Sequence, residues 1–203
     1  MSDPLGTSEP EEAPKSAPPD RAENGPLDVD EANPVRPYVD LGGVKIVAKP
    51  GMALRLEVEE GSKRVVAVAL DFADSTLQVQ PFAAPRTSGL WQEIRGQIAE
   101  QIRRQGGQVA EAEGSLGPEL HAQIPAPGQP GGMRLARFIG VDGPRWFLRG
   151  VISGKAAVDA SAAAQIEELF RSVVVVRGTT PMPPRDLIPL QVPATMQDVG
   201  SGA

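Results

Sequence analysis

The aromatic residues and the prolines of this chain occupy different parts of it, and this separation constrains the fold most. All 8 aromatic residues lie between Tyr38 and Phe170, whereas eight of the 21 prolines precede residue 38 and five follow residue 178. Aromatic and aliphatic side chains build a packed core, while proline interrupts helices and sheets. We therefore predict one folded domain over residues 38–178, flanked by a disordered acidic Pro-rich tail (1–37) and an extended Pro-rich segment (179–203).

The C-terminal segment contains apolar residues among its prolines, namely Leu187, Ile188, Leu190 and Val192. A polyproline-type segment can be a ligand for another protein or can lie along the surface of its own domain. We favour the second interpretation, a C-terminal strap, because the apolar residues can dock. A mobile interaction tail is the alternative.

Charge and composition exclude several classes of protein. Residues 1–36 contain nine acids and three bases, so the rest of the chain is neutral overall and lacks the excess of Lys and Arg typical of nucleic-acid binding. No signal-peptide pattern begins the sequence, and the longest apolar runs, such as Val173–Val176, are too short to insert into a membrane. The chain has no Cys, hence no disulfides or thiolate ligands. We expect a soluble cytoplasmic protein.

Most of the predicted domain alternates between apolar and polar residues with a period of two, which indicates β-strands. The first four strands suggest an antiparallel meander, and Asp142-Gly143 marks a tight turn between the last two. The predicted strands are Val44–Val47, Leu54–Val58, Val65–Leu70, Thr76–Phe82, Val109–Glu113, Glu119–Ile124, Met133–Val141 and Arg145–Ser153.

Two amphipathic helices interrupt this pattern. The first carries apolar residues at helical spacing from Leu90 to Ile102 and ends at Gly106-Gly107; the second begins after Asp159, a plausible N-cap residue. Ser172–Arg177 either extends the second helix or forms a last strand, and its four consecutive valines favour a strand. The order predicts an α+β antiparallel β-sheet sandwich with both helices on one face of the sheet.

Several blocks of sequence resemble a family of uncharacterised actinobacterial proteins, one of the families built on a domain of unknown function. The resemblance covers about residues 38–193 and implies no established activity or catalytic residues. The order of elements also resembles the PsbP/Mog1-like sandwich, whose members are mostly binding or assembly factors. The blocks are 38–42, 81–91, 137–150, 174–178 and 181–186.

The sequence offers little support for catalysis. His121 is the only histidine, and we expect it on a surface or half-buried strand position rather than in a triad or a zinc site. The Gly-rich run 128–132 lacks the residues that grip phosphate, and no Gly-x-Ser-x-Gly elbow occurs. We predict no catalytic residues, no metal and no cofactor. Five carboxylates are expected to be solvated near turns: Glu57, Glu59, Glu60, Asp71 and Asp74.

Arginines supply the most specific binding hypothesis. Arg145 and Arg149 share one face of a predicted strand with Phe147, while Trp146 faces the other side. Arginines on such a face either bind an anionic ligand or pair with acids on a solvated surface. The two tryptophans, Trp91 and Trp146, are predicted to belong to the core. The candidate ligand-binding set is Arg86, Arg145, Arg149 and Trp146.

Two functions therefore remain open. The first is a non-enzymatic protein-binding or assembly module that contacts a partner protein through an exposed face or the Pro-rich segment. The alternative is a small-molecule, nucleotide or anion-binding protein that uses the Arg/Trp face. We expect no nucleic acid as partner and no membrane insertion, and the sequence carries no signature of oligomeric state.

Overall fold

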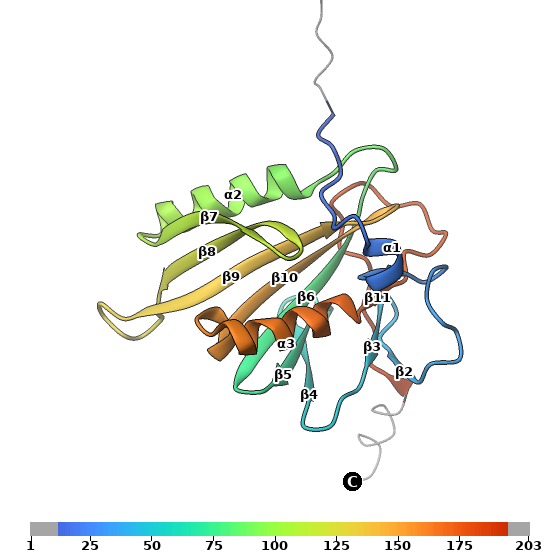
Figure 1. The fold of residues 1–203 in the computed structure, drawn as a ribbon, viewed down its shortest axis with the longest axis horizontal. Coiled ribbons are helices and arrows are strands. Elements are labelled where there is room, and N and C mark those ends of the chain that lie inside the picture. Colours follow the sequence, from blue (N-terminus) through green and yellow to red (C-terminus); the bar gives the residue numbers. More distant parts are fainter. Residues whose placement is uncertain (1–11, 195–203) are drawn as a thin grey trace, which may run out of the picture.

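A seven-stranded antiparallel sheet forms the centre of the molecule in the computed structural model, which describes residues 12–194 (Figure 1). The strand order, β4-β5-β6-β10-β9-β8-β7, joins two meanders through the pairing of β6 with β10. The strands are β4 (Ala53–Val58), β5 (Val65–Phe72), β6 (Ser75–Ala83), β7 (Gln108–Gly114), β8 (Gly117–Pro125), β9 (Met133–Asp142) and β10 (Trp146–Gly154).

A second, four-stranded sheet lies beside the first, with the order β1-β11-β3-β2. Its strands are β1 (Leu27–Asp28), β2 (Tyr38–Asp40), β3 (Val44–Val47) and β11 (Val174–Val175). The predicted strand β3 pairs antiparallel with β2 and β11 and not with β4, so the expected meander of the first four strands is wrong and contains only β4, β5 and β6. β1 pairs parallel with β11. The valine run thus contains a strand, as the sequence favoured, although it spans only two residues.

The predicted elements of the domain are confirmed. All eight expected strands occur within two residues of their predicted bounds, and the helices are α2 (Trp91–Arg104) and α3 (Ala160–Arg171), the latter following a short 3₁₀ turn, η1 (Lys155–Ala157). The carboxylate of Asp159 accepts a hydrogen bond from the backbone N–H of Ala162 at 2.8 Å, so it is the N-cap of α3. The α+β class follows from this architecture.

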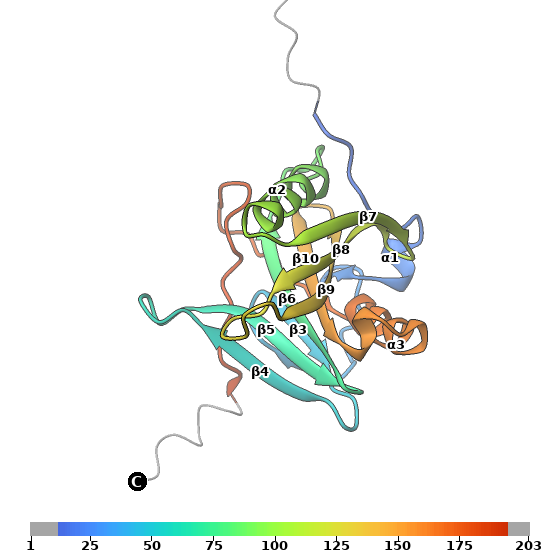
Figure 2. The ribbon, with the colours of Figure 1, turned by 90° about the vertical axis from the view of Figure 1, so that its left-hand side faces the viewer.

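The two helices cover opposite faces of the large sheet, so the expectation that both cover one face is wrong (Figures 1 and 2). Successive side chains of β10 point to alternate faces. Trp146 and Leu148 join the main core with Phe170 of α3, whereas Phe147 stacks on Trp91 of α2 with ring centroids 5.7 Å apart. The alternation of residues along a strand predicts which side chains share a face of the sheet, but it does not predict which helix covers that face.

The predicted disordered tail is also wrong for residues 12–29, which pack against the domain, whereas residues 30–37 form mostly exposed turns; residues 1–11 lie outside the described residues. The Lys15 ammonium donates to the carbonyls of Pro85 and Gly143 at 2.9 and 2.6 Å, and burial lowers the pKa of Lys15. The segment then forms a short helix, α1 (Arg21–Asn24). Beyond this helix, the Asp28 carboxylate accepts a hydrogen bond from Trp146 Nε1 at 2.9 Å. Hydrogen bonds and strand pairing, rather than apolar area, order this segment.

The C-terminal segment crosses the domain as a strap as far as residue 194, and residues 195–203 lie outside the described part of the chain. Ile188 and Leu190 are buried in the main core. Backbone bridges join Leu187 to Phe82 and Leu190 to Gly42 and Val65. The strap therefore contacts both sheets at once.

Candidate functional site

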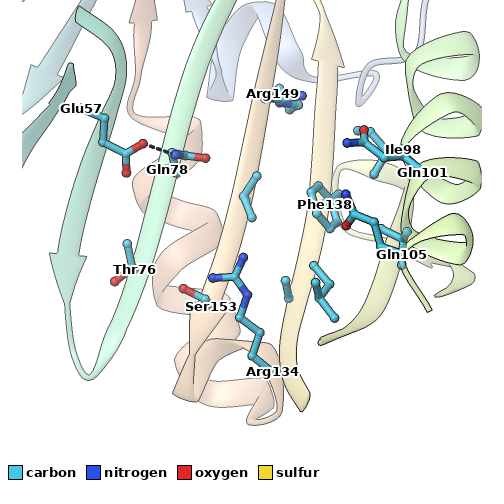
Figure 3. A pocket seen from close by; sticks show the side chains of 14 residues that line it. Glu57, Thr76, Gln78, Ile98, Gln101, Gln105, Arg134, Phe138, Arg149 and Ser153 are labelled. Atoms are coloured by element: carbon cyan, nitrogen blue, oxygen red, sulfur yellow. Dashed lines mark hydrogen bonds between the residues drawn. The ribbon is translucent and has the colours of Figure 1, made fainter. Parts of the chain in front are cut away.

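A cleft of about 380 Å³ lies on the side of the large sheet that α2 packs against, where the helix covers only part of that side (Figure 3). α2 lies mainly over β7, β8 and β9 and touches β10 at Phe147, so the same face of β6 and of the rest of β10 borders an open cleft. Residues from five strands of the large sheet, from the C-terminal half of α2 and from its C-cap line the cleft. They are Glu57, Thr76, Gln78, Ile98, Gln101, Ile102, Gln105, Ile124, Arg134, Ala136, Phe138, Arg149, Val151 and Ser153.

The lining divides into an apolar side and a polar side. Ile98 and Ile102 of α2 face the cleft together with Phe138 and Val151, which are cross-strand partners on β9 and β10. Polar side chains of β4 and β6 approach from the opposite side, where Glu57 accepts a hydrogen bond from Gln78 Nε2 (Figure 3). One side of the cleft therefore favours apolar groups and the other offers hydrogen bonds.

Arg149 lies in the centre of the sheet at one end of this cleft. Its guanidinium donates to Oε1 of Gln80, the residue directly opposite on β6, and lies 5.6 Å from the centroid of the Phe82 ring. Its Nε is buried without a hydrogen-bond partner, and no acid within residues 12–194 forms an ion pair with it. Burial lowers the pKa of Arg149. The guanidinium therefore holds a charge that the fold itself leaves uncompensated.

Arg134 lies at the other end of the cleft, on β9 (Figure 3). It is exposed, and its side chain forms no hydrogen bond or ion pair with another residue of the described part. Two arginines without acid partners thus line one cavity, and the carboxylate that lines it, Glu57, is bound to an amide.

The carboxylates expected near turns divide into two groups. Glu59 lies in the turn after β4, whereas Glu57 and Asp71 lie on strands. Hydrogen bonds from Arg55 at 2.5 Å and Thr76 at 2.6 Å lower the pKa of Asp71 to about 2. The charge of Asp71 is therefore compensated by Arg55 at the edge of the sheet beside the cleft.

The sequence-predicted set of Arg86, Arg145, Arg149 and Trp146 does not converge on one site. Trp146 is fully buried on the opposite face, because neighbouring residues of a strand point to opposite sides. Arg86 and Arg145 line a separate hollow, where Arg145 Nη2 donates to the Gly178 carbonyl at 2.7 Å. Four residues of extended chain separate Arg145 from Arg149 by about 13 Å, so only Arg149 reaches the cleft.

His121 occupies the strand position that the sequence predicted, on β8. Its Nε2 lies 2.5 Å from Glu119 Oε1, and the same carboxylate is bound by Arg137. This cluster faces α3, away from the cleft. Among the described residues there is no group of three or more His, Cys, Asp or Glu side chains arranged to hold a metal ion.

Sequence reasoning missed the polar residues of the cleft other than Arg149. The signal that would have found Gln78 is the alternation on β6, where Thr76, Gln78 and Gln80 share a face in the interior of the sheet. Polar side chains on one side of a central strand indicate that this side of the sheet is not fully covered by other elements. Gln101 and Gln105 of α2 gave no such signal, because polar residues are expected on an exposed helix surface.

Fold and site together define an α+β domain with a half-covered sheet face and an open cleft. The chain belongs to the family described as "Protein of unknown function (DUF3710)", whose sequence profile matches residues 25–199. The match begins before residue 38 and so includes part of the N-terminal segment that packs on the domain. No curated protein sequence matches the chain.

A search of solved structures finds the expected weak likeness to the cyanobacterial PsbP protein (CyanoP) of Synechocystis sp. PCC 6803. The identity is 12%, the TM-score is 0.40, and the alignment covers 71% of this chain and 96% of that protein. In residues 12–194, no helix combines the length and apolar character required to cross a bilayer.

Proposed function

We propose that this protein is a non-catalytic binding domain whose cleft takes a ligand that carries an anionic group, with Arg149 as the residue that receives it. The observation that supports the proposal is the half-buried, uncompensated guanidinium of Arg149 in a cavity. Withdrawing a charge from water without an opposite charge costs free energy, and an anion bound at the guanidinium offsets that cost.

The size and lining of the cleft support a small ligand. A volume of about 380 Å³ lies at the small end of the roughly 300–1,000 Å³ typical of ligand pockets. Its lining is more polar than that of a typical drug-sized pocket, because eight of its fourteen residues are polar or charged, and this suits a ligand that carries a charged group. Arg134 adds a second positive charge at the mouth.

A protein-binding module is the second candidate, and a separate observation favours it. Met133 and Leu135 of β9 are 44% and 41% exposed, and they lie on the face opposite the cleft. Exposed apolar side chains that share a strand face are typical of protein contacts. This surface and the cleft do not overlap, so the two candidates are tested separately.

The test of the anion proposal is calorimetric titration of the full chain with a panel of organic and inorganic anions, for the wild type and for Arg149→Gln. We expect at least one anion to bind the wild type and to lose most of its affinity in the variant. Stabilisation of the native state should reach about 2.7 kcal/mol at a hundredfold excess over Kd.

Arg145→Gln is the matched control, because it removes the same charge from the same strand region but from a different hollow. Its affinity should equal that of the wild type. If no anion binds, or if Arg149→Gln and Arg145→Gln weaken binding equally, the proposal is wrong.

A further inference from the structure

The lining of the cleft also limits which anion fits. We infer that the ligand is a small carboxylic acid with an apolar body, its carboxylate on Arg149 and its body under the C-terminal half of α2. This inference rests on the proposed function and specifies its ligand class.

The apolar wall beside Arg149 supports an apolar body. Phe138 and Val151 form the floor next to the guanidinium, and Ile98 and Ile102 of α2 lie above them. A ligand that binds Arg149 and extends along the cleft beneath α2 covers these four side chains, and removing their surface from water strengthens binding. An acid without an apolar body leaves that surface wet.

The orientation of α2 disfavours a phosphate ester. The residues of α2 that line the cleft, from Ile98 to Gln105, belong to the last two turns and the C-cap. The C-terminal end of a helix carries a partial negative charge, whereas phosphate sites typically use the N-terminal end. The N-terminus of α2 lies at Trp91, outside the cleft lining. A single negative charge, held by Arg149, suits this field better than two or more.

The charged residues that line the cleft also disfavour a ligand with several negative charges. Arg149 receives the acid at one end of the cleft, the exposed Arg134 lies at the other end, and Glu57 lies on the polar side of the same cavity. A ligand with several negative charges would place some of them near this carboxylate, which is unfavourable at short range. Gln101 and Gln105 can bond neutral oxygens of the ligand instead.

The experiment compares hexanoate and 3-phenylpropionate with acetate, inorganic phosphate and AMP, each titrated into the full chain and followed by calorimetry and by backbone amide NMR shifts. Because each buried CH₂ group strengthens binding about fourfold, we expect hexanoate to bind more than tenfold tighter than acetate. The largest shifts should occur in Ile98–Gln105 and in β10.

Variants locate the two halves of the ligand. Arg149→Gln should reduce hexanoate binding at least tenfold, whereas Val151→Thr, which keeps the side-chain shape and replaces one methyl group by a hydroxyl, should reduce hexanoate binding but leave acetate binding unchanged. Arg145→Gln is the control and should change neither. N-acetyl-Ala-Phe carries the same carboxylate and ring, so its affinity relative to 3-phenylpropionate shows whether the acid is free or is the end of a peptide.

The outcomes separate this inference from the proposed function. If phosphate or AMP binds in an Arg149-dependent way and hexanoate binds no better than acetate, the carboxylic-acid class is wrong and the anion-binding function stands. If none of the five anions binds, or if Arg149→Gln binds them like the wild type, both are wrong.

Discussion

Two arginines on neighbouring strands show how the two faces of the central sheet differ. Arg137 of β9 faces α3 and donates to Glu119 at 2.9 Å and to Glu167 at 2.7 Å. Burial opposes its charge, but the hydrogen bonds to both carboxylates outweigh burial and raise the pKa of Arg137. Arg149 of β10 faces the cleft, has a neutral amide as its partner, and its pKa is lowered. The acids of the α3 face compensate the charge of Arg137, whereas no acid of the described residues forms an ion pair with Arg149 on the α2 face.

The packing of the two faces differs in the same way. The α3 face belongs to the main core, which contains Trp146, Leu148 and Phe170 and continues into the smaller sheet. The α2 face has a compact cluster around Leu90, Trp91 and Phe147, and beyond it the sheet is open. The α3 face therefore carries most of the stability, which leaves the open part of the α2 face available for binding.

The largest loss of stability is expected for Trp146→Ala. This side chain is fully buried in the main core, and truncation of a buried aromatic costs about 3–5 kcal/mol through lost transfer free energy and the cavity that remains. Urea unfolding followed by circular dichroism measures the change, with the exposed Val158→Ala as control. A loss below about 1 kcal/mol, the average for point mutations in general, would mean that the α3 face is not the stabilising face.

A loss of about 3 kcal/mol is expected for Arg137→Gln, because it leaves the buried Glu119 carboxylate without its positive partner. The double variant Arg137→Gln, Glu119→Gln should recover part of this loss, since both charges are then absent. The free energy of unfolding of the two variants checks this. Equal stability of the single and double variants would contradict an ion-pair origin.

Asp142→Ala should lower stability by about 2 kcal/mol and loosen α2, which has no side-chain cap of its own. The buried Asp142 carboxylate accepts from the backbone N–H of Leu90 at 2.8 Å and of Ser16 at 2.9 Å. It therefore joins the start of α2 to the N-terminal segment.

Asp142→Asn, which keeps one acceptor oxygen, should lose less than Asp142→Ala. Hydrogen exchange of α2 amides measures the local effect. Unchanged exchange in both variants would show that Asp142 does not hold the helix in place.

The smallest effect is expected for Arg149→Gln, within about 0.5 kcal/mol of the wild type without ligand, because no acid partner is lost. Thermal unfolding compares it with Arg137→Gln, the matched change on the other face. A loss as large as that of Arg137→Gln would show that Arg149 is a structural residue, and the contrast between the faces would disappear.

The sequence determined the local elements because their signals are local. Alternation from Val44 to Phe82 defines four strands, and the carboxylate of Asp159 begins α3, since a cap depends only on the next turn. The same alternation assigns Arg149 and Trp146 to different sides of the sheet, because neighbours on a strand point to opposite faces.

Only the tertiary structure decided which element covers each face and what surrounds each charge. Trp146 Nε1 meets Asp28 across 118 residues of sequence, and Arg137 meets Glu167 across 30, so no local pattern predicts either contact. The packing of the N-terminal segment could not be predicted either, because its order comes from pairing with β11 rather than from its own apolar area. Likewise, the sequence named Arg149 as a candidate, but only the structure shows that it lines an open cleft, because α2 packs over β7, β8 and β9 beside it. The position of a helix over a sheet depends on contacts between distant parts of the chain.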